Sequence, residues 1–281
     1  MNNRAKVVAI TSLKGGSGKT SLTSLLARYY AEAEGKQVLV IDFDSGAGLT
    51  SLLYDQFIKD ETASIVEVLE DVMHYANPSE SFHRAIIQTR HQYSNSNQGS
   101  IFLLPSKPAL DNLLVGTKRN LLNAAIGLLD LPDDYIILID SGPNAVNVSN
   151  AIESADVVFI PFQFSRQDAF PAIDTLNYLI QCQREKDLPC FGGWVYIQDI
   201  NTQWEKHYLA NVKEAYKEIR YSNRVMCPNQ DPFIQMKPSR IIHRGVHMTW
   251  SIRDELFDAI REMAAVVKKT EKLYLLESYD G

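Results

Sequence analysis

The fold is decided by one stretch of sequence, Lys6-Val-Val-Ala-Ile-Thr-Ser-Leu-Lys-Gly-Gly-Ser-Gly-Lys-Thr20, and by the Ser21-Leu-Thr-Ser-Leu-Leu-Ala-Arg-Tyr-Tyr30 that follows it. Residues 6–11 are apolar and rich in β-branched side chains, which predicts a short buried strand. Residues 21–30 carry apolar side chains at helical spacing. The glycines between the two segments predict a tight loop that leads directly from the strand into the helix.

The same alternation of strand and helix continues along the chain. Gly35 ends the first helix, and the apolar run 37–42 then predicts a second strand, so the three elements form a βαβ unit with a right-handed crossover. Continuous apolar strands between helices indicate a parallel sheet that is covered on both faces. The expected fold class is therefore α/β, with a mostly parallel twisted sheet and helices on both faces. Further strands are expected at 100–105, 135–140, 157–161 and 193–197, further helices at 63–74, 79–89, 204–219 and 251–275, and a surface loop at 92–100.

Composition limits the class of protein. The chain has 281 residues, 45% of them hydrophobic, with no apolar run near the roughly 18–20 residues of a membrane span. The N-terminus does not have the pattern of a signal peptide, so a cytoplasmic location is expected. Cys182, Cys190 and Cys227 form no C-x-x-C pair, which argues against a metal site or a disulfide framework. Neither repeats nor low-complexity segments are evident, so residues 1–281 are predicted to form a single domain.

The glycine-rich loop has the residue types that bind phosphate. Glycines allow backbone turns that aim successive N–H groups at phosphate oxygens, and the following helix N-terminus adds its dipole. Lys19 would reach the β- and γ-phosphates of ATP, and the Thr20 hydroxyl would coordinate Mg²⁺. The sequence therefore predicts a P-loop that binds ATP and Mg²⁺. Its expected nucleotide-binding residues are Lys14, Gly15, Gly16, Ser17, Gly18, Lys19, Thr20 and Ser21.

Aspartates stand at the ends of two predicted strands. Asp140 ends the apolar run that starts at Tyr135, and it fits the carboxylate that binds the hydration shell of Mg²⁺. Asp44 lies one strand pleat beyond Asp42, where it would be nearer the γ-phosphate and could orient the attacking water. Asp42 has an alternative interpretation as a solvated residue of a strand-end turn. Both strand ends are expected to face one crevice of the sheet.

The loop Lys14-Gly-Gly-Ser-Gly-Lys-Thr20 resembles the deviant Walker A motif of the ParA/MinD family, in which the usual first glycine is absent; here Leu13 stands in its place. The resemblance implies that Lys14 is the signature lysine, which contacts phosphates bound by the partner subunit of an ATP-dependent homodimer. Lys14, Lys19 and Asp44 are then the expected catalytic residues. The resemblance covers most of the chain and includes Val40-Ile-Asp-Phe-Asp44, Leu103-Leu-Pro-Ser106, Ile139-Asp-Ser-Gly-Pro143 and Ile160-Pro161.

Two motifs depart from the ParA pattern. Asp44 is followed by Ser45-Gly-Ala-Gly48, where ParA proteins usually have Pro-Gln-Gly, and Ile-Asp-Phe-Asp44 is more similar to MinD. Asp140-Ser-Gly-Pro143 also differs from the ParA pattern with two prolines. The resemblance still implies slow ATP hydrolysis that an activating partner or cargo adaptor protein stimulates.

The C-terminal part carries the signals for partners. The formal net charge is −6, so any contact with DNA must be regional. Residues 237–253 contain no acid, and ParA-like proteins bind DNA without sequence preference through basic residues in this part, which suggests a patch on the protein that contacts the DNA backbone. The alternative is an ordinary solvated turn before the last helix. The chain end contains two acids and one lysine and is unlike a basic amphipathic membrane helix, so no stable membrane association is expected. The proposed DNA contacts are Lys237, Arg240, Arg244 and Arg253; adenine contacts are expected from 198–203 and 227–231.

Several functions remain open at this point. The first is a ParA-like ATPase on the nucleoid that positions or segregates a plasmid, a chromosome or a protein assembly. The second is a MinD-like membrane-associated or regulatory switch that does not bind DNA. A nitrogenase-iron-protein type would need cysteines at other positions, and a small-molecule kinase would leave Lys14 without a role.

Overall fold

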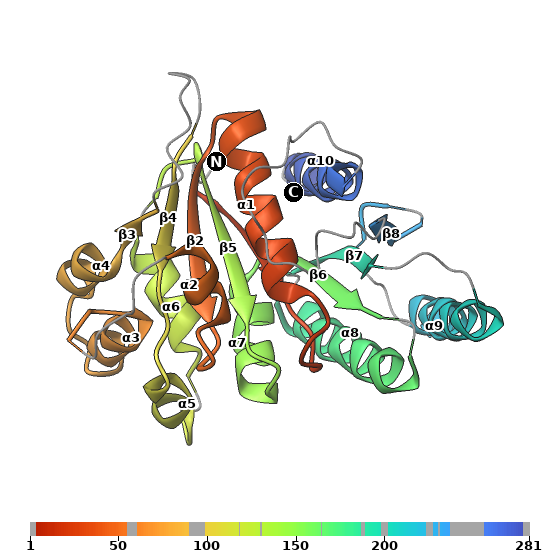
Figure 1. Ribbon diagram of the computed structural model, residues 1–281, viewed down its shortest axis with the longest axis horizontal. Helices are drawn as coiled ribbons and strands as arrows, with labels where there is room; N and C mark the ends of the chain where they lie inside the picture. Colours follow the sequence, from red (N-terminus) through yellow and green to blue (C-terminus); the bar gives the residue numbers. More distant parts are fainter. Residues whose placement is uncertain are drawn as a thin grey trace.

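The computed structural model describes residues 4–54, 61–89, 99–117, 119–129, 131–163, 165–186, 189–197, 202–222, 227–229, 231–236 and 256–277. An eight-stranded sheet forms the centre of this part of the chain, in the order β3-β4-β2-β5-β1-β6-β7-β8 (Figure 1). Only the pair β3–β4 is antiparallel among the described strands, and every other pair is parallel. The strands are β1 (Lys6–Ile10), β2 (Gln37–Phe43), β3 (Ile87–Gln88), β4 (Ile101–Leu104), β5 (Tyr135–Ser141), β6 (Val157–Phe162), β7 (Cys190–Ile197) and β8 (Phe233–Met236).

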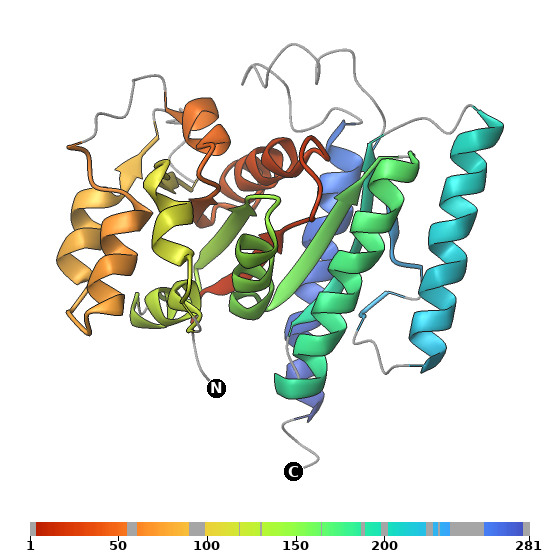
Figure 2. The ribbon, with the colours of Figure 1, turned by 90° about the horizontal axis from the view of Figure 1, so that it is seen from below.

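Helices cover both faces of the sheet because every central strand is apolar on both sides. The face formed by Val8, Ile10 and Val40 packs against α1 (Lys19–Glu34), α2 (Gly48–Leu53) and α10 (Leu256–Glu277). The opposite face packs against the remaining helices, and α8 and α9 lie at the other end of the sheet from α3 and α4 (Figure 2). These are α3 (Ile65–Met73), α4 (Ser79–Ala85), α5 (Ala109–Leu114), α6 (Leu121–Leu128), α7 (Ala145–Ser154), α8 (Arg166–Lys186) and α9 (Gln203–Ser222).

The described elements agree with most of the predicted ones, and one helix is shorter. The helix expected at 79–89 ends at Ala85, because Ile86 is extended and the two residues after it form β3 against β4. The first helix ends as predicted, with Gly35 in the left-handed region at φ 65°. The structure adds the short elements α2, α5, α6 and β8, for which no prediction was made.

Parallel pairing brings the ends of β1, β2 and β5 to one edge of the sheet. Asp42 and Asp140 are direct partners in the β2–β5 register, and Ile10 is the partner of Asp140 in β1. The glycine-rich loop leaves the sheet at this edge, between β1 and α1 (Figure 1). Of the helices in the described part of the chain, none combines the length and the hydropathy needed to cross a membrane.

Candidate nucleotide-binding site

The loop between β1 and α1 is shaped to receive an anion. Gly16 and Gly18 have φ values of 74° and 96°, a left-handed conformation that suits glycine. A Cβ atom added at Gly15 or Gly16 would meet no atom within 4 Å, so the outer side of the loop is open. Gly18 precedes α1 without a capping side chain, and the first turn of α1 contains no acidic residue. Its N–H groups and the positive end of the helix dipole therefore remain available to a phosphate.

Lys19 is buried beneath this loop. Its Nζ atom donates to the backbone carbonyl oxygens of Lys14, at 2.7 Å, and Ser12, at 3.3 Å. Burial lowers the pKa of Lys19, whereas the charges of Asp140 and Asp44 raise it. The loop carbonyls thus hold a cation directly under the open glycine cradle, at the position from which it can pair with phosphate.

Thr20 and Asp140 meet at the same edge of the sheet. The Thr20 hydroxyl donates to Oδ2 of Asp140 at 2.7 Å. Oδ1 of Asp140 is buried and has no hydrogen-bond partner in the described part of the chain. A hydroxyl and a carboxylate with a free oxygen are the hard oxygen donors that Mg²⁺ takes, directly or through its water shell. This pair therefore fits the predicted magnesium position.

Asp42 is a structural residue of the strand end and not a solvated turn residue. Its side chain is fully buried. Oδ2 accepts hydrogen bonds from the backbone N and the Oγ1 atom of Thr50, both at 2.7 Å, and Oδ1 accepts from the backbone N of Asp44 at 3.3 Å. The alternative of a solvated strand end is thus wrong for Asp42. Its carboxyl group ties the start of α2 to the end of β2.

Asp44 lies on the loop just beyond, beside the end of β5. Its Oδ1 atom accepts a hydrogen bond from Gly46 N at 3.0 Å. A Cβ atom added at Gly142 would lie 3.1 Å from the same oxygen, so the two loops are in close contact here. The Asp44 side chain is half-buried and reaches the edge of the site. Its role in orienting the attacking water remains a prediction.

The acidic groups of the site are held in a poor environment for charge. Burial raises the pKa of Asp42 to about 7. Burial first, and then the charge of Asp42, raises the pKa of Asp140 well above its usual range, although the Thr20 hydroxyl and Lys19 act in the opposite direction. Burial therefore penalises the charged form of both carboxyl groups at these two adjacent strand ends.

Lys14 differs from Lys19 in its contacts. Its side chain is half-buried at the start of the loop, and it makes no hydrogen bond or ion pair with the described residues. The backbone carbonyl of the same residue accepts from Lys19 Nζ and from Ser17 Oγ. The loop thus carries two lysines, and in the described part of the chain only the ammonium group of Lys19 is bound by the loop's own carbonyl oxygens.

Sequence reasoning missed two residues that support the loop from the β6–α8 side. Thr175 Oγ1 accepts a hydrogen bond from Leu13 N at 3.1 Å, and Gln163 Nε2 donates to Gly16 O at 3.0 Å. Both contacts join residues about 150 positions apart in the chain. No local pattern around either residue signals its role, because the contact exists only once β6 and α8 are packed beside β1.

Most residues of the predicted DNA and adenine contacts lie outside the part of the chain that the structure describes. Lys237, Arg240, Arg244 and Arg253 lie outside the described residues, as do 198–201 and 230 of the segments expected to contact adenine. In the described remainder, Cys227 Sγ donates to Asn229 O, and Asn229 Oδ1 accepts from Lys269 Nζ of α10. The contacts to adenine and to DNA therefore remain predictions.

A strand, a glycine-rich turn, a helix with an open N-terminus and carboxyl groups on two adjacent strand ends define a P-loop nucleotide site. A protein-family model described as an AAA domain matches residues 5–186. The maintenance of carboxysome distribution protein A of Gloeothece citriformis is 30% identical over 194 residues, covering 67% of each chain. The sporulation initiation inhibitor protein Soj of Bacillus subtilis is 25% identical over 226 residues, covering 77% of this chain and 82% of Soj.

The fold has solved counterparts. A structure of an ATP complex of a McdA variant from Cyanothece superposes with a TM-score of 0.71 at 20% identity, covering 95% of this chain and 96% of that one. At this identity the likeness shows the fold, which agrees with the predicted α/β class. The chain belongs to the AAA-domain family matched over residues 5–186, in its ParA/MinD group of P-loop ATPases.

Proposed function

We propose that residues 1–281 form a single ATPase domain that works as an ATP-driven positioning protein. In its cycle the chain binds ATP and Mg²⁺, pairs with a second copy, holds DNA on the nucleoid without sequence preference and hydrolyses ATP slowly until a partner protein stimulates it. The observation that carries the proposal is the pair of lysines on one loop. Lys19 is bound by carbonyl oxygens of its own loop, whereas the Lys14 ammonium has no partner among the described residues.

The geometry and charge of the site support the role proposed for each residue. The loop 14–18 and the N-terminus of α1 would hold the phosphates, and Lys19 would exchange its carbonyl partners for phosphate oxygens. Thr20 and Asp140 would hold Mg²⁺, which neutralises phosphate charge when it is bound. Asp44, at the edge of the site, would orient the attacking water. Lys14 would contact the nucleotide of the second copy, which makes dimerisation depend on ATP.

The relatives support positioning as the task. One is named for the distribution of carboxysomes, and a structural neighbour from Borrelia burgdorferi, bound to AMPPNP, is described as a putative plasmid partition protein. A protein of this kind needs a surface to hold, and the acid-free segment 237–253 offers cations for the phosphate backbone of DNA. We therefore place DNA before a membrane as the surface that this chain uses.

The test is binding of the purified protein to nonspecific DNA with ATP, with ADP and without nucleotide, at two salt concentrations. ATP-dependent binding that weakens with salt is the expected result. Lys14→Gln should retain ATP binding but lose the dimer and the DNA. Arg240→Glu with Arg244→Glu should keep the dimer and lose only the DNA.

A charge-matched control is available on α9. Lys206 and Lys217 are exposed, and their double replacement by glutamate should leave DNA binding unchanged if the segment 237–253 is the contact. Binding in no nucleotide state would overturn the DNA part of the proposal. The regulatory or membrane switch would then be favoured, and ATP-dependent flotation with anionic vesicles would separate those two.

A further inference from the structure

The carboxylate of Asp111 joins the two loops that border the ATPase site. Asp111 lies in the first turn of α5, and its Oδ2 atom accepts a hydrogen bond from Ser45 Oγ at 2.6 Å. Its Oδ1 atom accepts from the side-chain amides of Asn144, at 3.2 Å, and Asn147, at 3.4 Å. Ser45 directly follows Asp44, and Asn144 lies four residues beyond Asp140. One side chain thus holds the loop after β2 and the loop after β5 together.

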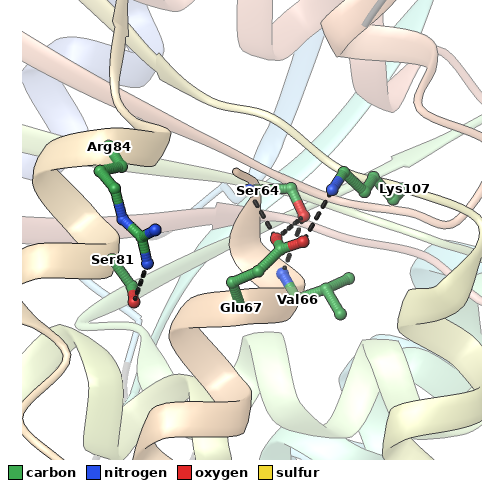
Figure 3. A network of polar contacts seen from close by, with 6 residues as sticks. All are labelled: Ser64, Val66, Glu67, Ser81, Arg84 and Lys107. Atoms are coloured by element: carbon green, nitrogen blue, oxygen red, sulfur yellow. Dashed lines mark hydrogen bonds and ion pairs between the residues drawn. The ribbon is translucent and has the colours of Figure 1, made fainter. Parts of the chain in front are cut away.

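The start of α5, which carries Asp111, is itself fixed by polar contacts. The segment that leads into α5 is tied to the strand end, because Ser106 N donates to Oγ1 of Thr50, which in turn bonds Asp42. On its other side, Lys107 Nζ pairs with Glu67 Oε1 at 2.7 Å, and Glu67 closes the capping box of α3 with Ser64 (Figure 3). The start of α5 is therefore anchored before it presents Asp111 to the site.

On the side of the loop after β5, the hydrogen bonds of Asp111 involve Asn147 of α7. This residue is fully buried. A Cβ atom added at Gly142 would lie 2.6 Å from Asn147 Nδ2 and 3.1 Å from Asp44 Oδ1, so the amide that bonds Asp111 and the Asp44 carboxyl flank the same glycine. A shift of either loop would displace Asp44 relative to the end of β5.

We propose that Asp111 is a positioning residue for ATP hydrolysis: through Ser45, Asn144 and Asn147 it fixes the loop that carries Asp44 at the edge of the site. The inference rests on the proposed function, in which Asp44 orients the attacking water. Asp111 touches neither the P-loop nor Lys19 among the described contacts, so it acts on turnover and leaves the binding of ATP to the phosphate loop. Displacement of a catalytic group by about 1 Å can lower turnover by as much as 10²-fold.

Asp111→Ala tests this role, with Asp71→Ala as a matched control. Asp71 lies on α3 and accepts a hydrogen bond from Ser81 of α4. Ser81 also accepts a hydrogen bond from Arg84 (Figure 3). ATP affinity is measured with a fluorescent ATP analogue, and turnover by release of phosphate. Asp111→Ala should lower kcat by roughly 10-fold with the Kd for nucleotide unchanged. Asp71→Ala should keep the kcat of the wild type.

Two further readouts exclude a merely structural effect. Asp111→Asn, which keeps the shape and much of the hydrogen bonding, should restore most of kcat. In single-turnover measurements Asp111→Ala should cause no further loss in an Asp44→Ala background, since both act through the same step. Equal turnover of Asp111→Ala and the wild type, or an undiminished loss in the Asp44→Ala background, would overturn the proposal. A wild-type protein that binds no ATP or never hydrolyses it would instead refute the proposed function and this role with it.

Discussion

Replacing Asp42 by asparagine should flatten the pH dependence of stability in the ligand-free protein. Burial raises the pKa of Asp42 from 3.8 to about 7, whereas the unfolded chain should ionise near the ordinary value. Between these two pH values the native state binds more protons than the unfolded state, so the free energy of unfolding falls as pH rises. The stability that the neutral carboxyl group gives is fully present below the unfolded-state pKa of 3.8, and it is lost as the pH rises through the folded-state pKa of about 7.

The size of this change in the free energy of unfolding follows from the difference between the two pKa values. One pKa unit corresponds to about 1.4 kcal/mol, so the full shift is worth about 4 kcal/mol, and about 3 kcal/mol of it is lost between pH 5 and pH 8. Asparagine removes the ionisation, and its carbonyl oxygen can still accept from Thr50 N and Oγ1. The variant should therefore lose less stability than the wild type over this range.

The assay is urea unfolding without nucleotide or Mg²⁺ at both pH values, with the free energy of unfolding obtained by linear extrapolation. The difference between the two pH values should shrink by about 3 kcal/mol in Asp42→Asn. Asp258→Asn is the control, because that side chain is 61% exposed on α10, and it should behave as the wild type does. An identical loss of stability with pH in Asp42→Asn and the wild type would refute the argument that burial of this carboxyl group controls the effect.

Two glycines give further predictions. Gly142→Ala should lower kcat at least 10-fold and retain ATP binding. The added Cβ would lie 2.6 Å from Asn147 Nδ2 and would displace that buried amide. Release of phosphate measures kcat, and a normal value would contradict this prediction. Gly99→Ala should lower the free energy of unfolding by more than about 2 kcal/mol, because its Cβ would lie 1.7 Å from the backbone oxygen of Lys36. Gly127→Ala, on α6, is the control, because its added Cβ would meet nothing within 4 Å. Its free energy of unfolding should rise by about 0.5–1 kcal/mol. Equal melting temperatures for Gly99→Ala and Gly127→Ala would contradict the steric argument.

The strands and the phosphate loop could be predicted from sequence because their signals are local. An apolar run such as 135–140 needs burial on both faces, and only a parallel sheet with two helical layers supplies it. The strand β3 could not be predicted in this way, since two residues carry no period. Its pairing with β4 ends α4 early, and that pairing depends on a neighbour supplied by the tertiary fold.

The site divides in the same manner. The P-loop is one continuous segment, and the positive φ values of its turn are met by Gly16 and Gly18 within that segment. The loop could therefore be predicted from its local sequence. The contacts that position the loop and Asp44 come from Thr175, Gln163 and Asp111, which the fold brings from other helices and strands. Hydrogen bonds across such distances follow from packing and leave no pattern in sequence.

The buried acids explain why such a site is unfavourable when it is empty. Asp42 and Asp140 are neighbours in the sheet, and both are buried where ionisation is penalised. Apolar residues at these strand ends would give a more stable ligand-free protein, because they would remove both desolvation penalties. A bound Mg²⁺ ion would carry the charge opposite to these carboxyl groups and would offset the cost of ionising them, so its binding to the folded protein would stabilise that state. The stability of the strand ends that carry Asp42 and Asp140 would thereby depend on binding of the cation.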